Sequence, residues 1–135
     1  MYKHIIKLRV RYSETDKMGV VYYGNYPQYF EVGRVEYMRD MGVVYAELEK
    51  QGILMPVVNL EISYRAPGLY DEELTIETWI EKLPTSKIVF KNKVLGEDGR
   101  LICEGKVTLV FVNDKFKPTQ PPVIVVEALK SKGLS

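Results

Sequence analysis

Asp16 and the helix start that follows it carry the residue types from which this sequence could build a reaction centre. The stretch from Tyr12 to Gly42 contains a polar turn, an aromatic loop at 20–24 and a long helical pattern. The first N–H groups of a helix lack intrahelical partners and lie at the positive end of its dipole. They can hold an anion, or a carbonyl oxygen that becomes negative during a reaction. A carboxylate beside such a helix end could attack an electrophilic carbon or activate water.

Each of these residues also has an ordinary structural interpretation, and both interpretations stay open at this stage. An aspartate in a polar turn most often closes or caps that turn. Aromatic residues such as Tyr22, Tyr23 and Tyr26 are more often core residues than substrate contacts. Glu31 on the long helix is interpreted as a polar-face residue, with a catalytic carboxylate as the alternative.

The elements that position these residues begin with the long helix. Asn25 is expected to cap it, with Gln28 completing a capping box, and Gly42 to end it. Gly33 lies within the apolar face, where we expect it to let another backbone approach closely. The residues on that face are Tyr26, Tyr29, Phe30, Gly33, Tyr37 and Met41.

Alternation of apolar and polar residues predicts five strands around this helix. The last strand is apolar on both faces, so we expect it inside the sheet. Ile5, Trp79 and Val89 on the outer face predict self-association. The fold class is therefore α+β, an antiparallel five-stranded sheet wrapped around one long central helix, in a single domain over residues 1–135. The predicted strands are 3–12, 54–66, 73–82, 88–96 and 101–112, with short helices at 43–51 and 125–130.

Composition excludes several classes of function. The 135 residues are 46% hydrophobic, which is typical of one globular domain. A net charge of +1 gives no argument for binding nucleic acid or a membrane surface. The single cysteine, Cys103, rules out an internal disulfide and favours a reducing compartment, so we expect the cytoplasm. The single histidine, His4, is expected to be structural, and the N-terminus has no apolar run long enough for a membrane span.

Residues 15–26, TDKMGVVYYGNY, resemble the signature of the hotdog-fold acyl-CoA thioesterases. The similarity is to the 4-hydroxybenzoyl-CoA thioesterase family and its Tol-Pal-associated short-chain acyl-CoA thioesterase relatives. Residues 64–74, YRAPGLYDEEL, and 84–87, PTSK, resemble the same family, in the same order along nearly the whole chain. The loop before the helix is the more specific part of the match.

The resemblance implies hydrolysis of an acyl-CoA thioester to a carboxylic acid and coenzyme A, without a metal or redox cofactor. It places the catalytic carboxylate, a nucleophile or general base, at Asp16 and the oxyanion donor at the backbone N–H of Tyr23. One branch of the family has histidine where Tyr23 stands, so the tyrosine favours the aromatic acyl-CoA branch. The other substrate-binding candidates are Tyr22, Gly24, Asn25 and Tyr26 near the thioester, and Ser86 and Lys87 for the phosphates of coenzyme A.

The resemblance also implies a homodimer or a homotetramer in which two sheets join edge to edge and each site is completed by the other subunit. In that arrangement we expect Asp16 to face Asn59, Glu61 or Ser63 of a partner. Two alternatives remain open from the residues. One is a non-catalytic module that binds acyl-CoA or acyl carrier protein, and the other is a hotdog hydratase or dehydratase, which His4 is badly placed to serve.

Overall fold

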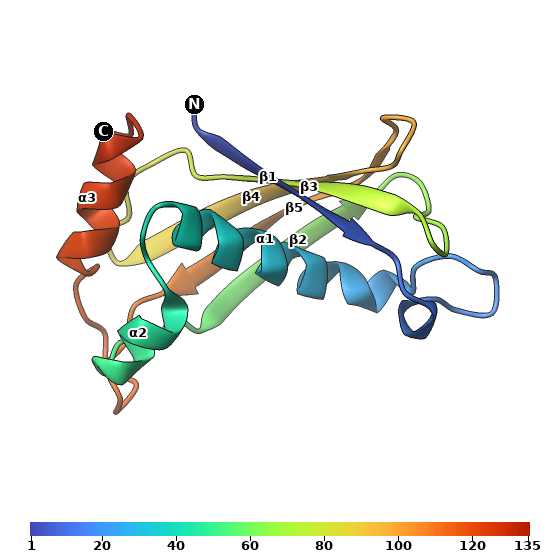
Figure 1. The fold of residues 1–135 in the computed structure, drawn as a ribbon. Helices are drawn as coiled ribbons and strands as arrows, with labels where there is room; N and C mark the ends of the chain where they lie inside the picture. Colours follow the sequence, from blue (N-terminus) through green and yellow to red (C-terminus); the bar gives the residue numbers. More distant parts are fainter.

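The computed structural model describes residues 1–135 and shows a five-stranded antiparallel sheet curved around one long helix (Figure 1). The strand order is β1-β3-β4-β5-β2, so β1 and β2 form the edges and β5 lies inside the sheet, as its apolar sequence predicted. The predicted α+β hotdog architecture is confirmed. The strands are β1 (Lys3–Arg9), β2 (Val57–Tyr64), β3 (Glu73–Trp79), β4 (Lys87–Leu95) and β5 (Leu101–Val110). The helices are α1 (Tyr26–Asp40), α2 (Tyr45–Lys50) and α3 (Val123–Ser131), with 3₁₀ turns η1 (Tyr12–Glu14) and η2 (Tyr23–Asn25).

The first strand ends earlier than the alternation predicted. β1 stops at Arg9, Val10 is buried and donates its N–H to the carbonyl of Glu72, and Tyr12 already opens η1. The chain turns here because Val10 is held by the β2–β3 connection rather than by a neighbouring strand. This turn brings the polar segment beside the start of α1.

The buried face of α1 follows the predicted wheel, with three changes. Arg34 and Met38 are buried, and Met41 is only partly buried. Tyr37 packs edge-on against Phe90 of β4, with ring centroids 5.9 Å apart. Burying each large apolar side chain of this face stabilises the fold by about 1.5–3 kcal/mol.

Gly33 permits a close approach, but of side chains rather than of another backbone. A Cβ at this position would lie 2.5 Å from Oγ1 of Thr78 and 3.0 Å from Cγ2 of Ile76. Thr78 is itself fixed, because its hydroxyl accepts a hydrogen bond of 2.8 Å from the Asn92 amide. The absence of a side chain at residue 33 therefore sets the distance between α1 and the sheet.

The two ends of α1 differ from expectation in different ways. Asn25 has helical backbone angles and makes no capping hydrogen bond, so the predicted capping box is wrong. Its amide donates instead to the carbonyl of Glu14, at 2.8 Å. Pro27 lies in the first turn as expected, and Gly42 ends the helix with φ of 85°, where its N–H donates to the carbonyl of Arg39.

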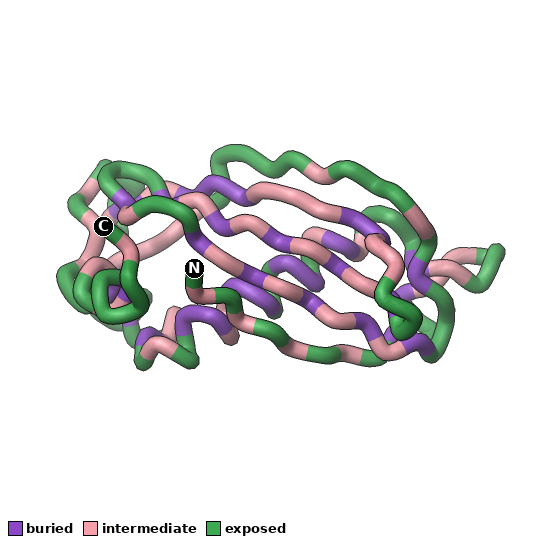
Figure 2. The backbone as a smooth tube through the Cα atoms, turned by 90° about the horizontal axis from the view of Figure 1, so that it is seen from above, coloured by how far each residue is buried: buried purple, intermediate pink, exposed green.

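Strand β2 is exposed along almost its whole length, whereas β3 and β4 alternate between buried and half-buried residues (Figure 2). Register with β5 places Leu60, Ile62 and Tyr64 on the helix side of the sheet. Although they lie on the helix side, Leu60 and Tyr64 remain exposed in the single chain. An edge strand with uncovered apolar residues is a surface suited to pairing.

We predict that Gly33→Ala lowers the free energy of unfolding by about 1–3 kcal/mol, because overpacking against Thr78 outweighs the gain of about 1 kcal/mol in helix propensity. Urea unfolding measures the change. Arg39→Ala, at an exposed position of the same helix, is the control and should change stability by less than about 0.5 kcal/mol. A Gly33→Ala protein more stable than the parent would contradict this packing.

Candidate active site

Asp16 lies in a tight hairpin loop just before the aromatic segment. Its N–H donates to the carbonyl of Val20 at 2.9 Å, and its Oδ1 accepts the N–H of Met18 at 2.8 Å. Gly19 closes the loop with φ of 77°, a conformation that favours glycine. Asp16 is thus a turn residue, as its ordinary interpretation held. Its second carboxylate oxygen has no hydrogen bond within the chain, and its side chain is half-exposed at an open hollow.

Glu14 fixes this loop to the start of α1. Its carboxylate is buried and accepts hydrogen bonds from the backbone and guanidinium of Arg11 and from the hydroxyl of Tyr29, the last at 3.0 Å. Its own carbonyl accepts the N–H of Tyr22 and the amide of Asn25. One residue therefore ties η1, the aromatic loop and α1 together.

The charge on Glu14 is stabilised by these donors. Burial alone would raise the pKa of this carboxyl, but the hydrogen bonds from Arg11 and Tyr29 outweigh burial and hold the pKa below its usual range. Burial and the adjacent carboxylate raise the pKa of Tyr29, so its hydroxyl keeps its proton and remains a donor. The anchor is therefore intact at neutral pH.

The helix start offers two free N–H groups. Asn25 donates its N–H to the carbonyl of Tyr22, whereas no hydrogen bond within the chain uses the N–H of Tyr23 or Gly24. The Tyr22 ring lies over Gly24, where a Cβ would come within 2.6 Å of it. These two N–H groups can donate hydrogen bonds to a ligand oxygen that becomes negatively charged.

Aromatic side chains surround this helix start. Tyr22 and Tyr23 are exposed, with ring centroids 4.8 Å apart, and Tyr64 of β2 donates its hydroxyl to the carbonyl of Tyr23 at 3.3 Å. Tyr26 is buried, and burial raises its pKa to about 12. Its hydroxyl accepts the N–H of Gly68, so among the substrate-binding candidates Asn25 and Tyr26 hold loops, while Tyr22, Tyr23 and Gly24 face solvent.

The loop between β2 and β3 supports the Asp16 hairpin from the other side. Val21 donates its N–H to the carbonyl of Gly68 at 2.8 Å, and Tyr70 donates to the carbonyl of Gly19 at 2.9 Å. The supporting loop pairs with the aromatic segment as two strands do. This pairing fixes the position of the Asp16 hairpin relative to the start of α1. Residues 64–74, which resemble the family, thus support the Asp16 hairpin.

An ion pair between the buried Glu72 and the partly exposed Arg100 holds the supporting loop in place. The carboxylate of Glu72 accepts the N–H of Leu69 and pairs with both terminal nitrogens of Arg100, at 2.6 and 2.7 Å. Arg100 also donates to the carbonyl of Pro67. The Arg100 guanidinium is the main cause that lowers the pKa of Glu72 to about 2.

Ser86 and Lys87 lie at the opposite end of the sheet from Asp16. They precede or open β4, whose nine residues span about 27 Å. Lys87 lines an outer-face hollow with Lys82, Lys91 and Lys106, whereas Ser86 lines a different one with Thr85 and Pro118. One chain therefore does not bring these two residues to the Asp16 loop.

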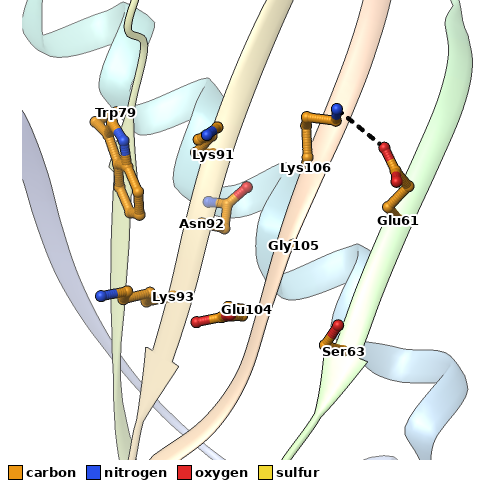
Figure 3. A pocket seen from close by; sticks show the side chains of 9 residues that line it. All are labelled: Glu61, Ser63, Trp79, Lys91, Asn92, Lys93, Glu104, Gly105 and Lys106. Atoms are coloured by element: carbon orange, nitrogen blue, oxygen red, sulfur yellow. Dashed lines mark ion pairs between the residues drawn. The ribbon is translucent and has the colours of Figure 1, made fainter.

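Another hollow lies on the outer face of the sheet, away from α1 (Figure 3). Trp79 and several charged side chains line it, and Lys106 pairs with Glu61 at 3.1 Å. Glu61 belongs to the same strand face as Asn59 and Ser63, which point away from the helix side. On the side of the Asp16 loop, β2 presents apolar and aromatic residues rather than these polar ones. They are Leu60, Ile62 and Tyr64.

The family model of the thioesterase-like superfamily matches residues 10–129. The chain belongs to this superfamily. YneP of Bacillus subtilis, provisionally named an acyl-CoA thioesterase, is 39% identical over 120 residues and 87% of each chain. The Escherichia coli acyl-CoA thioester hydrolase YbgC is 30% identical over 91% of this chain and 92% of its own. The structure of a DHNA-CoA thioesterase from Staphylococcus aureus superposes with a TM-score of 0.86, at 40% identity, covering 89% of this chain and 81% of that one.

Sequence reasoning missed the two carboxylates that hold this thioesterase-like site together. Glu14 was interpreted only as part of a polar turn, since nothing local distinguishes a buried glutamate from an exposed one. Glu72 and Arg100 are 28 residues apart, and no periodicity links them.

His4 lies on β1 opposite Thr78, five residues before the end of the strand that leads to the Asp16 loop. None of the helices is long and apolar enough to span a membrane.

We predict that Glu72→Gln destabilises the protein by on the order of 3 kcal/mol at pH 7. The folded pKa lies below the ordinary value of 4.5, so the ion pair contributes fully above that pH and loses its contribution as the pH falls toward 2. The difference from the parent in urea unfolding should therefore shrink to about half or less at pH 3.

Asp98→Asn is the matched control, because Asp98 also bonds Arg100 but is exposed and should matter little. If the loss of unfolding free energy in Glu72→Gln stays constant between pH 7 and pH 3, the carboxylate charge is not what holds the loop.

Proposed function

We propose that this protein hydrolyses acyl-CoA thioesters. The observation that carries the proposal is a half-exposed carboxylate, Asp16, on a loop built against a helix start whose Tyr23 and Gly24 N–H groups have no partner. The names of the related proteins YneP and YbgC support the same substrate class. An anion-stabilising helix end beside a carboxylate is what attack on a thioester carbonyl requires.

Two routes use this arrangement. As a general base, Asp16 takes a proton from water, and the resulting hydroxide adds to the thioester carbon. As a nucleophile, Asp16 adds to that carbon itself and forms a mixed anhydride, which water then hydrolyses. In both routes the N–H groups of Tyr23 and Gly24 stabilise the oxyanion, and the carbon–sulfur bond breaks to release coenzyme A as a thiolate that takes up a proton.

The surroundings of the site favour an aromatic acyl group. The exposed rings of Tyr22 and Tyr23 lie beside the free N–H groups, and aromatic pairs gain about 0.5–1.5 kcal/mol beyond area burial. A hydratase fits less well, because His4 lies on the first strand away from the Asp16 loop. A non-catalytic binder of acyl-CoA or acyl carrier protein would leave the free carboxylate oxygen without a function.

The site is completed by a second chain in this proposal. In one chain the Asp16 hollow is open, and apolar residues are exposed along the neighbouring edge of the molecule. Pairing of β2 with β2 of a second copy would cover Leu60 and Tyr64 and wall off the thioester from water. The charged outer face, with Trp79, Ile5 and Val89, is then available for two dimers to form a homotetramer. A buried free thiol at Cys103 fits the cytoplasm.

Lys87 is proposed to contact the phosphates of coenzyme A. It shares its hollow with three further lysines, of which Lys91 pairs with Glu81 at 2.9 Å, while Lys87 has no ion pair within the chain. Lys106 is paired as well, with Glu61, so Lys82 and Lys87 are the lysines of this hollow whose charge is free to attract phosphate. Because this hollow lies at the far end of the sheet from Asp16, the phosphates would belong to a substrate whose thioester lies in a site of the assembled oligomer.

We expect Asp16→Asn to fold normally and to lose activity by about 10²–10⁴-fold in kcat. Asparagine keeps the side-chain oxygen that accepts the Met18 N–H, so the loop is preserved while the charge is lost. Release of free thiol from a panel of aromatic and aliphatic acyl-CoA esters measures turnover. Asp114→Asn, an exposed loop carboxylate, is the control, and near-normal turnover by Asp16→Asn on the best ester would refute the catalytic assignment.

The double variant Ser86→Ala/Lys87→Ala is expected to raise the Michaelis constant for acyl-CoA by about tenfold while leaving kcat close to that of the parent, because phosphate contacts lie away from the reacting carbon. The control is Lys115→Ala, an exposed lysine outside the hollow. Short thioesters without the nucleotide should show no change in either constant. An unchanged Michaelis constant for coenzyme A esters places the phosphates elsewhere.

A further inference from the structure

Arg34 of α1 is a buried cation without a counter-charge. It is 8% exposed, its Nε has no hydrogen-bond partner, and it takes part in no ion pair of the chain. A guanidinium stays protonated in proteins, and burying an unpaired charge is costly. The single chain therefore lacks a counter-charge for this residue.

The groove that Arg34 lines opens toward the β2 edge. It runs between the first half of α1 and the helix side of β2 and β5, and the residues that line it are Pro27, Gln28, Glu31, Arg34, Val57, Leu60 and Val107. Tyr45 adjoins the same place, and its hydroxyl is also buried. Burial raises the pKa of Tyr45 to about 12, while the charge of Arg34 and its contact with the hydroxyl act in the opposite direction. Tyr45 is therefore a neutral neighbour of the guanidinium and does not supply the counter-charge.

Glu31 is the complementary group on the same surface. It is exposed, lines the same groove and is not paired with Arg34, although the two are three residues apart on one helix. Elsewhere on α1 the same spacing does give an ion pair, between Glu36 and Arg39 at 3.3 Å. The groove therefore presents one unpaired cation and one unpaired carboxylate side by side.

We propose that Arg34 and Glu31 of one chain pair with Glu31 and Arg34 of a second copy, across a two-fold axis beside β2. In a two-fold interface the same surface meets itself, so residue i contacts j while j contacts i. A surface that carries one charge of each sign is self-complementary under this operation. The inference rests on the proposed two-chain site and adds the contact that sets the register of α1 against its partner.

The occupant is a second copy because the apolar surface continues beyond the ion-pair residues. Val57 and Leu60, which line the groove, and Tyr64 farther along β2 are exposed, and β2 has an unpaired edge. Joining two copies here buries the apolar residues, pairs the strand edges and supplies the missing carboxylate together. Bidentate pairing also suits the planar guanidinium.

The test uses charge reversal and mixing. Arg34→Glu and Glu31→Arg should each raise the dimer dissociation constant by at least about 100-fold, because like charges then meet across the axis. Mixing the two variants should give a heterodimer in which both pairs are restored, with a dissociation constant within about tenfold of the parent. Sedimentation equilibrium measures this without substrate, so the result is independent of whether the protein hydrolyses thioesters.

Glu36→Arg and Arg39→Glu form the matched control, since they have the same spacing on α1 but lie outside the groove; they should leave the dissociation constant unchanged. Arg34→Met and Glu31→Gln, checked for folding by circular dichroism, test the pair if charge reversal prevents folding, and each should weaken the dimer at least tenfold. Folded Arg34→Met and Glu31→Gln proteins that dimerise like the parent would overturn the inference. An Arg34→Met protein that dimerises normally but binds acyl-CoA more weakly would also overturn it, because the guanidinium would then bind the substrate rather than the second chain.

Discussion

The buried carboxylate of Glu14 is the interaction on which the candidate site depends. It accepts hydrogen bonds from Arg11, just before η1, and from Tyr29 of α1, while the carbonyl of Glu14 accepts the N–H of Tyr22 and the side-chain amide of Asn25. A buried carboxylate must satisfy its hydrogen bonds, so the segments that supply the donors are held in one arrangement. The free N–H groups of Tyr23 and Gly24 are the consequence, because the loop that precedes them bonds to Glu14 rather than folding back over the helix end.

A second constraint acts at the β2 edge. The core is complete around the buried face of α1, but the groove between α1 and β2 contains an unpaired guanidinium and exposed apolar residues. The same edge borders the aromatic surface of the helix start through Tyr64. In the arrangement we propose, catalysis and assembly depend on adjacent surfaces, and a thioester bound at the helix end is closed off by the second chain whose carboxylate pairs with Arg34.

Local patterns in the sequence were sufficient to predict the helices and strands. Apolar alternation and the α1 wheel predicted the sheet and the helix, because burial on one face leaves a period in the sequence. Long-range polar contacts were not predictable in this way. Asn25 fits an N-cap by type, yet its amide finds the carbonyl of Glu14, and Gly33 makes room for Thr78 from a distant strand. Ser86 and Lys87 were grouped with the site by resemblance, and a single chain separates them from it.

The most direct test of the central claim is a crystal structure with a non-hydrolysable acyl-CoA analogue in which a ketone replaces the thioester. We predict that the ketone oxygen accepts hydrogen bonds of about 3 Å from the backbone N–H of Tyr23 or Gly24. The free carboxylate oxygen of Asp16 should face the ketone carbon. A ketone bound away from this helix start, with both N–H groups still facing water, would contradict it.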